Sequence, residues 1–295
     1  MSRGIAASVL ASSLFALMYY YTSMLQPLTG EEIFGWRMLL TLPCVTVFLL
    51  CTGDWRLAVG VLRRIAQKPA RLAGSVATAA LMGLQLWLFL WAPLHGRSLE
   101  VSMGYFLLPL AMVLTGKLMW GESLSRAQTV AVILAALGVG HELLRHGSFA
   151  WETLIVTLGY PVYFILRRRL RTDHLGGLWT DMLIITPVAL YFVASGPLSL
   201  QDLADRPALW ALIPGLGVIS ALALVSYVMA SRQLPFNLFG LLSYVEPVLL
   251  VAVSLLLGES IGAEQWPTYA AIWAAVAVLI VEGLRHLLKR GLGRR

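Results

Sequence analysis

A glutamate followed by a proline stands inside an apolar stretch of the sequence, at Glu246 and Pro247. Glu246 lies about eleven residues into that stretch, and a charged side chain at the centre of a bilayer costs about 2.5–3.5 kcal/mol on insertion scales. A carboxyl at such a position could carry a coupling proton or bind a cationic group. The alternative is a permanently neutral carboxyl that is hydrogen-bonded to a neighbouring helix.

Two prolines, Pro109 and Pro247, fall near the middle of apolar stretches that we expect to be helical. Proline has no N–H and clashes with the preceding turn, so the carbonyls of Tyr105 and Ser243 would lose their helical partners. In a membrane, such groups are tolerated where protein or cavity water satisfies them. The two prolines therefore predict helix kinks that open a substrate site, although plain packing kinks would give the same pattern.

Polar residues recur along one face of five apolar stretches. Such a stripe could line a wet cavity, and the alternative is packing of small residues between helices. Deep aromatic side chains could add an apolar wall for an aromatic or amphipathic ligand. The predicted substrate-binding and coupling residues are Glu246, Gln85, Tyr105, Ser243, Trp87 and Tyr227.

The sequence contains no Cys-x-x-Cys pair, no His-Glu-x-x-His motif and no Walker loop. Its two cysteines, Cys44 and Cys51, would lie about 10 Å apart on a helix, which is too far for a disulfide. The five histidines fall in connections or at the ends of apolar stretches. We therefore expect no bound metal, no cofactor and no catalytic residues, and the protein is not predicted to be an enzyme.

The composition of the chain indicates which structural elements position these residues. The 295-residue chain is 59% hydrophobic and 13% charged, whereas soluble domains carry about 25% charged residues. This excludes an ordinary soluble enzyme, a disordered protein and a disulfide scaffold. Stretches of about 20 apolar residues cross a bilayer as helices, and ten are expected, approximately at 4–22, 32–51, 72–92, 100–119, 125–143, 149–167, 175–195, 208–230, 236–257 and 266–284.

Most of the lysines and arginines fall in alternate connections between these stretches, and the net charge is +7. The positive-inside rule then places both termini in the cytoplasm of a plasma (inner) membrane. Basic connections would face anionic lipid headgroups, and no basic exposed module for nucleic acid remains. Inside the stretches, Arg37 is expected to pair with Glu31, Glu32 or Glu100, and Asp181 with the basic cluster at 167–171.

A short motif repeats, since GESLSRAQ at 121–128 returns as GESIGAEQ at 258–265. The matched prolines lie at a similar spacing, so we expect two repeats of five helices, at 1–147 and 148–295. Because five is odd, the second repeat would enter the membrane from the opposite side. Inverted repeats are typical of secondary transporters, although some channels and membrane enzymes are also built by duplication.

The stretch at 83–139 resembles the RarD-type branch of the EamA family, in the drug/metabolite transporter superfamily. Further similarity lies in EEIFGWRMLL at 31–40, GYPVYFILRRRL at 159–170 and YVEPVLLVAVSLLLGES at 244–260. The resemblance implies ten helices, two inverted repeats and a central cavity in a plasma-membrane carrier. The name of the RarD-type branch refers to chloramphenicol sensitivity. This chain departs from the family pattern at Leu108, Glu246 and Gln85.

These observations predict an all-α integral membrane protein that works as a secondary transporter by alternating access. The expected substrates of this exporter are small organic metabolites or amphipathic drugs such as chloramphenicol. Since no ATP-binding motif occurs, a proton gradient is the expected energy source. A passive channel or facilitator is the alternative function. Expected partners are the substrate, protons and the lipid bilayer, with a homodimer as one possible assembly.

Overall fold

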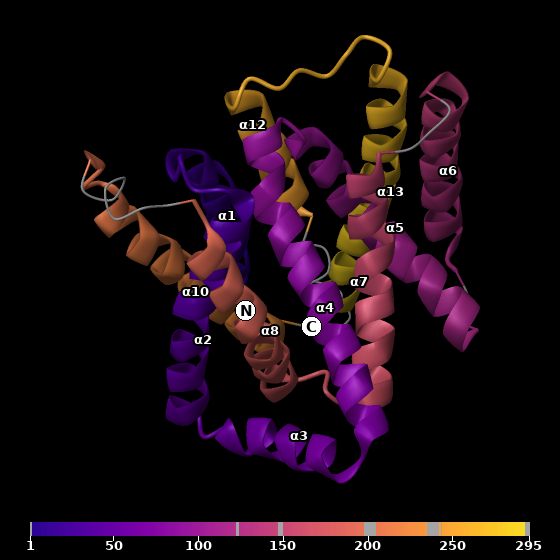
Figure 1. Cartoon of the computed structure of the whole chain (residues 1–295). Helices are drawn as coiled ribbons and strands as arrows, with labels where there is room; N and C mark the ends of the chain where they lie inside the picture. The colour runs from indigo at the N-terminus through magenta and orange to yellow at the C-terminus, as the bar shows by residue number, and fades with distance from the viewer. Residues whose placement is uncertain are drawn as a thin grey trace. The chain divides into compact units, whose positions relative to one another are not determined.

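The computed structural model describes residues 2–121, 124–146, 150–197, 205–234, 242 and 244–292, and these residues form helices and connections without a strand. Figure 1 shows the helices as coiled ribbons. In chain order they are α1 (Ser2–Met24), α2 (Gly30–Cys51), α3 (Trp55–Gln67), α4 (Pro69–Trp91), the short 3-10 helix η1 (Ala92–His95), α5 (Ser98–Trp120), α6 (Arg126–His146), α7 (Trp151–Leu170), α8 (Leu175–Ser195), α10 (Leu209–Gln233), α12 (Val245–Leu256) and α13 (Trp266–Leu292).

Six helices of the described part are long and apolar enough to cross a membrane. They are α1, α2, α4, α5, α8 and α10. Two shorter apolar helices follow at Val245–Leu256 and Trp266–Glu282. The protein is therefore a multi-pass helical membrane protein. Each apolar stretch that the sequence predicts overlaps a helix, and the number of ten spans stays a prediction.

The chain forms two compact units, and each unit takes helices from both halves of the sequence. Unit 1 comprises residues 1–13, 97–161 and 226–295, and unit 2 comprises residues 14–96 and 162–225. These units group residues by contact in space, whereas the expected division at 147/148 concerns sequence repeats. The repeat boundary therefore also stays a prediction.

In unit 2, α2 and α8 pack along each other in opposite directions. Gly35 near the start of α2 meets the end of α8, because a Cβ on Gly35 would lie 2.7 Å from the carbonyl oxygen of Ala189 and from a methyl of Val193. At the opposite end of α2, Trp179 Nε1 donates a hydrogen bond to Thr46 Oγ1 at 2.8 Å. A glycine at the crossing allows the two backbones to approach closely.

The other helices of unit 2 also pack on α8. α4 packs against α8 where Gly83 leaves room for the side chain of Ile185. α3 occupies the connection between α2 and α4, where the sequence analysis expected no helix. It contacts the start of α8, since a Cβ on Gly176 would lie 2.5 Å from the backbone nitrogen of Ala58.

In unit 1, α6 and α13 pack along each other, again in opposite directions. Near the end of α6, His141 Nδ1 lies 3.1 Å from Thr268 Oγ1, and Thr268 Oγ1 donates to Glu142 Oε2 at 3.0 Å. Thr268 stands near the start of α13. At the other end of the pair, Arg126 and Glu282 line one groove.

α5 and α12 form a second antiparallel pair in unit 1. Glu259, just after α12, accepts hydrogen bonds from the backbone N–H groups of Ser98 and Leu99 at 2.8 and 2.7 Å. A carboxylate at this position satisfies free N–H groups at the start of α5 and suits the positive end of the helix dipole. The glutamate of the second GES motif therefore caps a helix, while Glu122 of the first lies outside the described residues.

The two prolines differ in their surroundings. Pro109 lies inside α5, as expected. Pro247 stands instead in the first turn of α12, which begins at Val245 with Tyr244 as its N-cap. A proline is favourable there because the first N–H groups of a helix have no intrahelical acceptor. The expected position in mid-helix is therefore corrected for Pro247 to a helix start.

Candidate functional site

Three tyrosines and one glutamate from four helices of unit 1 lie close together. The hydroxyl oxygens of Tyr105 on α5 and Tyr160 on α7 are 3.1 Å apart, and their ring centroids are 5.9 Å apart. The hydroxyl of Tyr227 on α10 interacts electrostatically with Glu246 on α12 and with Tyr160. We call Tyr105, Tyr160, Tyr227 and Glu246 the tyrosine–glutamate group.

All four members of this group are at least partly open to solvent. Tyr105, Tyr160 and Glu246 are partly exposed, and Tyr227 is 38% exposed. Hydroxyl groups can donate or accept hydrogen bonds, and a carboxyl can also exchange a proton. Together they can bind a polar or cationic group of a small molecule between otherwise apolar helices.

Contacts between α5 and α7 position two members of the group. Thr153 Oγ1 donates to the carbonyl oxygen of Glu100 at 2.7 Å, and Thr157 Oγ1 donates to that of Gly104 at 3.4 Å. A Cβ on Gly104 would lie 2.6 Å from Val156 Cβ, so the helices approach closely at this glycine. The sequence places Tyr105 directly after this contact, which brings its ring to α7.

The connection before α5 is held by a charged cluster. Arg97 donates to the two carboxylate oxygens of Glu152 from Nε at 2.6 Å and from Nη2 at 3.0 Å. Its Nη1 also lies 3.0 Å from Glu100 Oε1. The hydrogen bond with Glu152 raises the pKa of Arg97, although burial acts in the opposite direction. This forked pair fixes the starts of α5 and α7, the two helices that carry Tyr105 and Tyr160.

The structure does not place the other predicted site residues in this group. Gln85 and Trp87 are on α4 in unit 2, where Gln85 is buried and Trp87 Nε1 donates to Glu31 Oε1 at 3.1 Å. Ser243 lies outside the described residues. The structure thus brings Tyr105, Tyr227 and Glu246 together, and a shared site with Gln85 and Trp87 stays a prediction.

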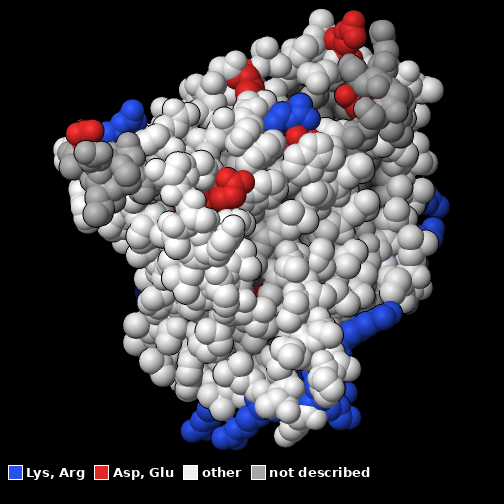
Figure 2. Space-filling model, in the orientation of Figure 1, with Lys and Arg blue, Asp and Glu red and all other residues white. Residues whose placement is uncertain are grey.

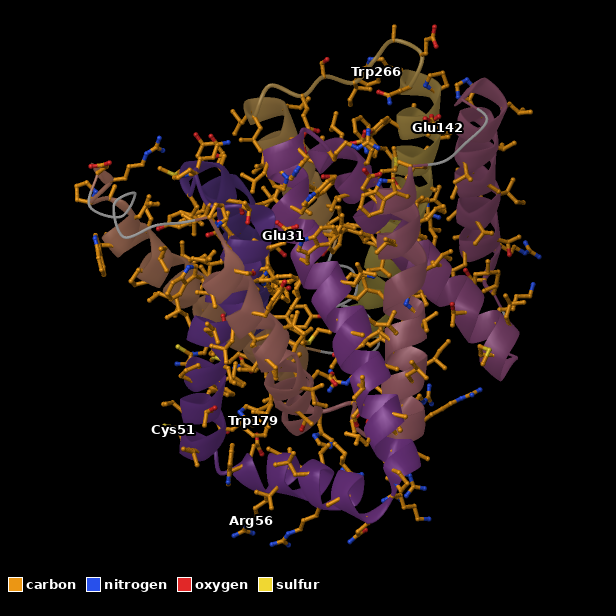
Figure 3. All side chains as sticks on the ribbon, in the orientation of Figure 1. Glu31, Cys51, Arg56, Glu142, Trp179 and Trp266 are labelled. Atoms are coloured by element: carbon orange, nitrogen blue, oxygen red, sulfur yellow. The ribbon has the colours of Figure 1, made fainter. Side chains whose placement is uncertain are left out.

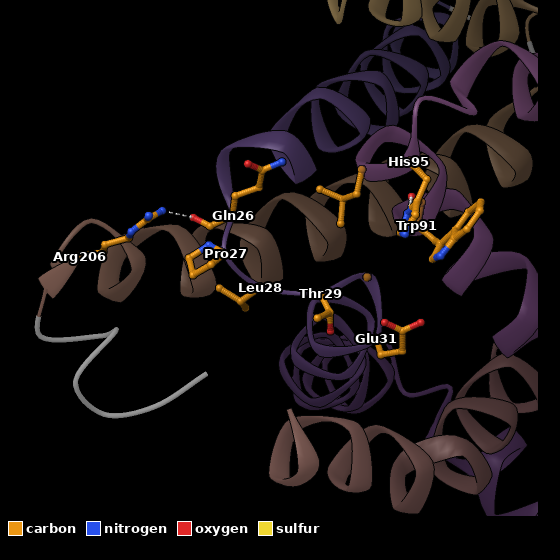
Figure 4. A pocket seen from close by; sticks show the side chains of 10 residues that line it. Gln26, Pro27, Leu28, Thr29, Glu31, Trp91, His95 and Arg206 are labelled. Atoms are coloured by element: carbon orange, nitrogen blue, oxygen red, sulfur yellow. Dashed lines mark hydrogen bonds between the residues drawn. The ribbon is translucent and has the colours of Figure 1, made fainter. Parts of the chain in front are cut away.

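A pocket of about 410 Å³ lies in unit 2, around the connection from α1 to α2. Figure 4 shows Glu31, Trp91 and His95 at one end of it. The rings of Trp91 and His95 are stacked with centroids 4.0 Å apart. At the opposite end, Arg206 Nη1 donates to the carbonyl oxygen of Gln26 at 3.0 Å. The pocket was not predicted from the sequence, because its lining combines a turn with the ends of separate helices.

Asp181 on α8 is the centre of a buried network in unit 2. Its Oδ1 accepts a hydrogen bond from Thr78 Oγ1 at 2.7 Å, and its Oδ2 accepts one from the hydroxyl of Tyr163 at 3.1 Å. Arg167 Nη1 in turn donates to that hydroxyl at 2.6 Å. Arg167 also donates to the carbonyls of Thr172 and His174. The expected link from Asp181 to the cluster at 167–171 therefore exists, but it runs through Tyr163.

Arg37 contacts a hydroxyl and an aromatic ring on neighbouring helices. Its Nε donates to Ser220 Oγ at 3.1 Å, and its guanidinium lies 5.8 Å from the centre of the Phe89 ring. Two of the expected partners make other contacts. Glu32 forms a capping box with Thr29, and Glu31 accepts from an indole. Hydroxyl and ring contacts across helices therefore surround Arg37, and its pairing with a glutamate stays a prediction.

Comparison with known proteins identifies the family. The chain is 43% identical to the chloramphenicol-sensitive protein RarD of Pseudomonas aeruginosa, over 98% of this chain and 97% of that protein. It is 42% identical to an uncharacterised transporter of Pasteurella multocida, over 98% of this chain and 99% of that protein. The chain belongs to the RarD-type transporter family. The resemblance found in the sequence is thereby confirmed.

Other comparisons concern more distant similarity. A protein named RarD from Streptomyces exfoliatus is 28% identical over 93% of this chain and 87% of that protein. A chain in a solved crystal structure superposes with a TM-score of 0.59 and 19% identity, over 97% of this chain and 99% of that chain, which shows a shared fold. No family model matches the chain. Membership in the RarD-type family therefore depends on the full-length relatives.

Proposed function

We propose that this RarD-type protein is a secondary transporter that exports small organic metabolites or amphipathic drugs. It would work by alternating access in the plasma (inner) membrane, with both termini in the cytoplasm. The tyrosine–glutamate group carries the proposal, since it places a carboxyl and three hydroxyls between apolar helices. Polar groups in such surroundings are costly and mark substrate or proton pathways.

The directions of packed helices support the inverted repeats of this proposal. α2 and α8 hold the second place in the two expected repeats, α5 and α12 the fourth, and α6 and α13 the fifth. Each of these pairs packs antiparallel within one unit. Equivalent helices that run in opposite directions are what a repeat of inverted topology requires.

The substrate class comes from the relatives and from the site. One relative is named for sensitivity to chloramphenicol, an amphipathic small molecule. Hydroxyls of Tyr105 and Tyr160 could bind polar groups of such a ligand, and the aromatic rings could cover its apolar part. Glu246 would take up the coupling proton. Gln85, Trp87 and Ser243 would complete the binding site.

Transport by the purified protein in liposomes tests this function. We expect counterflow, because a carrier exchanges substrate across the membrane and is stimulated by substrate on the far side. The readout is uptake of radiolabelled chloramphenicol and amino acids, with and without an imposed pH gradient. Uptake without stimulation from the far side would identify a passive facilitator and contradict alternating access.

Glu246→Gln tests the role of the carboxyl. We expect the variant to lose the response of transport to the pH gradient while it still folds and inserts, because glutamine keeps the size of the side chain but cannot exchange a proton. Glu264→Gln is the matched control, since Glu264 is an exposed carboxyl in the connection before α13. A pH response that survives Glu246→Gln would exclude Glu246 from coupling.

A further inference from the structure

α3 has one face that is fixed to unit 2. Ala58 and Val61 are buried, at 0% and 2% exposure, and α3 packs against both α4 and α8. At the start of the helix, the rings of Trp55 and Trp179 meet edge to face with centroids 5.0 Å apart. Ala58 on α3 and Gly176 on α8 let the two backbones approach closely. The helix is therefore held in a defined orientation.

The opposite face of α3 carries Arg56 and Arg63. These arginines are seven residues apart, so they lie on the same side of the helix with about 10 Å between them along its axis. Both are exposed. Figure 3 shows Arg56 extending away from α3, and Figure 2 shows the basic side chains gathered at that end of the molecule as blue atoms.

A third arginine of α3 has a different role. Arg64 Nε donates to the carbonyl oxygen of Gly60 at 3.1 Å, and its Nη1 donates to that of Arg171 at 3.2 Å. Arg64 thus helps to hold α3 beside the connection between α7 and α8. Within the described part of the chain, Arg56 and Arg63 make no such hydrogen bond or ion pair.

Apolar side chains flank the two exposed arginines. Leu57 and Leu62 each keep 36% of their surface exposed, and Leu72 at the start of α4 keeps 47%. A short helix with a basic face and exposed apolar side chains lies in the interfacial region of a membrane. Soluble partners would leave these leucines in water.

We propose that α3 binds the headgroups of anionic phospholipids, with Arg56 and Arg63 donating hydrogen bonds to phosphate oxygens. Guanidinium groups bind phosphate through two parallel N–H···O bonds. Leu57 and Leu62 would contact the upper part of the acyl chains. The exposed leucines favour a membrane lipid over a soluble phosphate as the source of the headgroup.

Lipid binding to the full-length protein tests this site. The detergent-solubilised protein is titrated with fluorescent phosphatidylglycerol, and with fluorescent phosphatidylcholine, a zwitterionic lipid without net charge, as the comparison. We expect tighter binding of phosphatidylglycerol. Arg56→Gln combined with Arg63→Gln should weaken that binding about twenty-five-fold, since each basic residue near an anionic surface contributes roughly fivefold.

Two further variants serve as controls. Lys117→Gln combined with Arg169→Gln removes the same charge from exposed positions outside α3, and it should change binding little. Arg56→Lys combined with Arg63→Lys keeps the charge and loses the two-pronged geometry, so an intermediate affinity is expected. The apparent Tm in uncharged detergent verifies that each variant is folded.

Several results would overturn the proposal. Equal losses in the α3 variant and in the control outside α3 would show a general charge effect. Equal affinity for the two lipids would show that the net negative charge of the headgroup is not recognised. Full competition by soluble glycerol phosphate would show that a free phosphate occupies the arginines. The assay needs no transport, so its result is independent of the proposed function.

Discussion

Asp181 in unit 2 and Glu246 in unit 1 are carboxyl groups within apolar helices, and their surroundings differ. Asp181 is 3% exposed, and its two oxygens accept hydrogen bonds from Thr78 and Tyr163. Glu246 is partly exposed and interacts with the hydroxyl of Tyr227. A buried carboxylate with fixed donors on each oxygen contributes to a specific packing, whereas a partly exposed one can change partners.

The difference between the two carboxyls indicates a structural role for Asp181 and a functional role for Glu246. Removal of a buried group leaves its donors without an acceptor, which costs more than the hydrogen bonds themselves contribute. A carboxyl that exchanges protons must be able to lose its partners at little cost. We therefore expect changes around Asp181 to lower stability and changes around Glu246 to alter transport.

The largest effect is expected for Asp181→Leu. The variant leaves the hydroxyls of Thr78 and Tyr163 without the carboxylate that accepts their hydrogen bonds, and it removes the negative charge that interacts with Arg167. Loss of one member of a buried charged network costs about 3–5 kcal/mol. The measurement is the apparent Tm in detergent by size exclusion after heating, with Glu246→Leu as the matched variant. An equal fall in Tm for the two variants would show that Asp181 contributes no more to stability than Glu246 does.

Tyr163→Phe is expected to have the next largest effect. It removes the hydroxyl that connects Arg167 to Asp181 and leaves a buried carboxylate oxygen short of a donor. The cost of such an unsatisfied group is about 1–3 kcal/mol. The same thermal assay measures it, with the exposed Tyr191→Phe as control, since Tyr191 is 66% exposed. A Tm equal to that of the control would show that Arg167 and Asp181 do not depend on Tyr163.

Tyr105→Phe should change stability less, because Tyr105 is partly exposed. Hydrogen bonds between membrane helices contribute about 0.6 kcal/mol on average. We expect a small change in Tm together with weaker substrate binding, measured as a higher substrate concentration for half-maximal counterflow. A large fall in Tm with unchanged substrate affinity would show that Tyr105 has a structural role. The surroundings of Glu246 would then resemble those of Asp181 more closely in their contribution to stability.

The smallest effect is expected from His174, whose carbonyl accepts a hydrogen bond from Arg167. Burial, and then the positive charges of Arg167 and Arg64, lower the pKa of His174. The folded protein therefore binds this proton less readily than the unfolded chain, and stability should fall as the pH drops through about 6.5. His174→Gln should reduce the change in Tm between about pH 7.5 and about pH 5.5. An unchanged pH profile would show that His174 makes no contribution.

Much of the fold was predictable because length and hydropathy determine which segments can cross a bilayer. The sequence did not predict α3, because its basic residues made the stretch after Cys51 look like a polar connection. The alternation of Ala58 and Val61 with Arg56 and Arg63 was the available signal. It indicates an amphipathic helix only once the buried face is known.

The candidate site was predictable in part. Glu246 and Tyr105 stood out from their apolar surroundings, and Tyr160 lay on a polar stripe of its own helix. Which hydroxyl meets which carboxyl depends on contacts between distant segments, and a single sequence does not contain that information. Arg37 shows the same limit, since its neighbour Ser220 follows 183 residues later.

The two threonines of α7 that bind carbonyl oxygens of α5 have a mechanical consequence. Thr153 and Thr157 attach one helix to the backbone of the other at successive turns, so this part of α7 and α5 should move as a single rigid body. Distances between spin labels on these two helices would then stay constant while substrate crosses the membrane. Any widening around Tyr105 would then come from displacement of α10 or α12, which carry Tyr227 and Glu246.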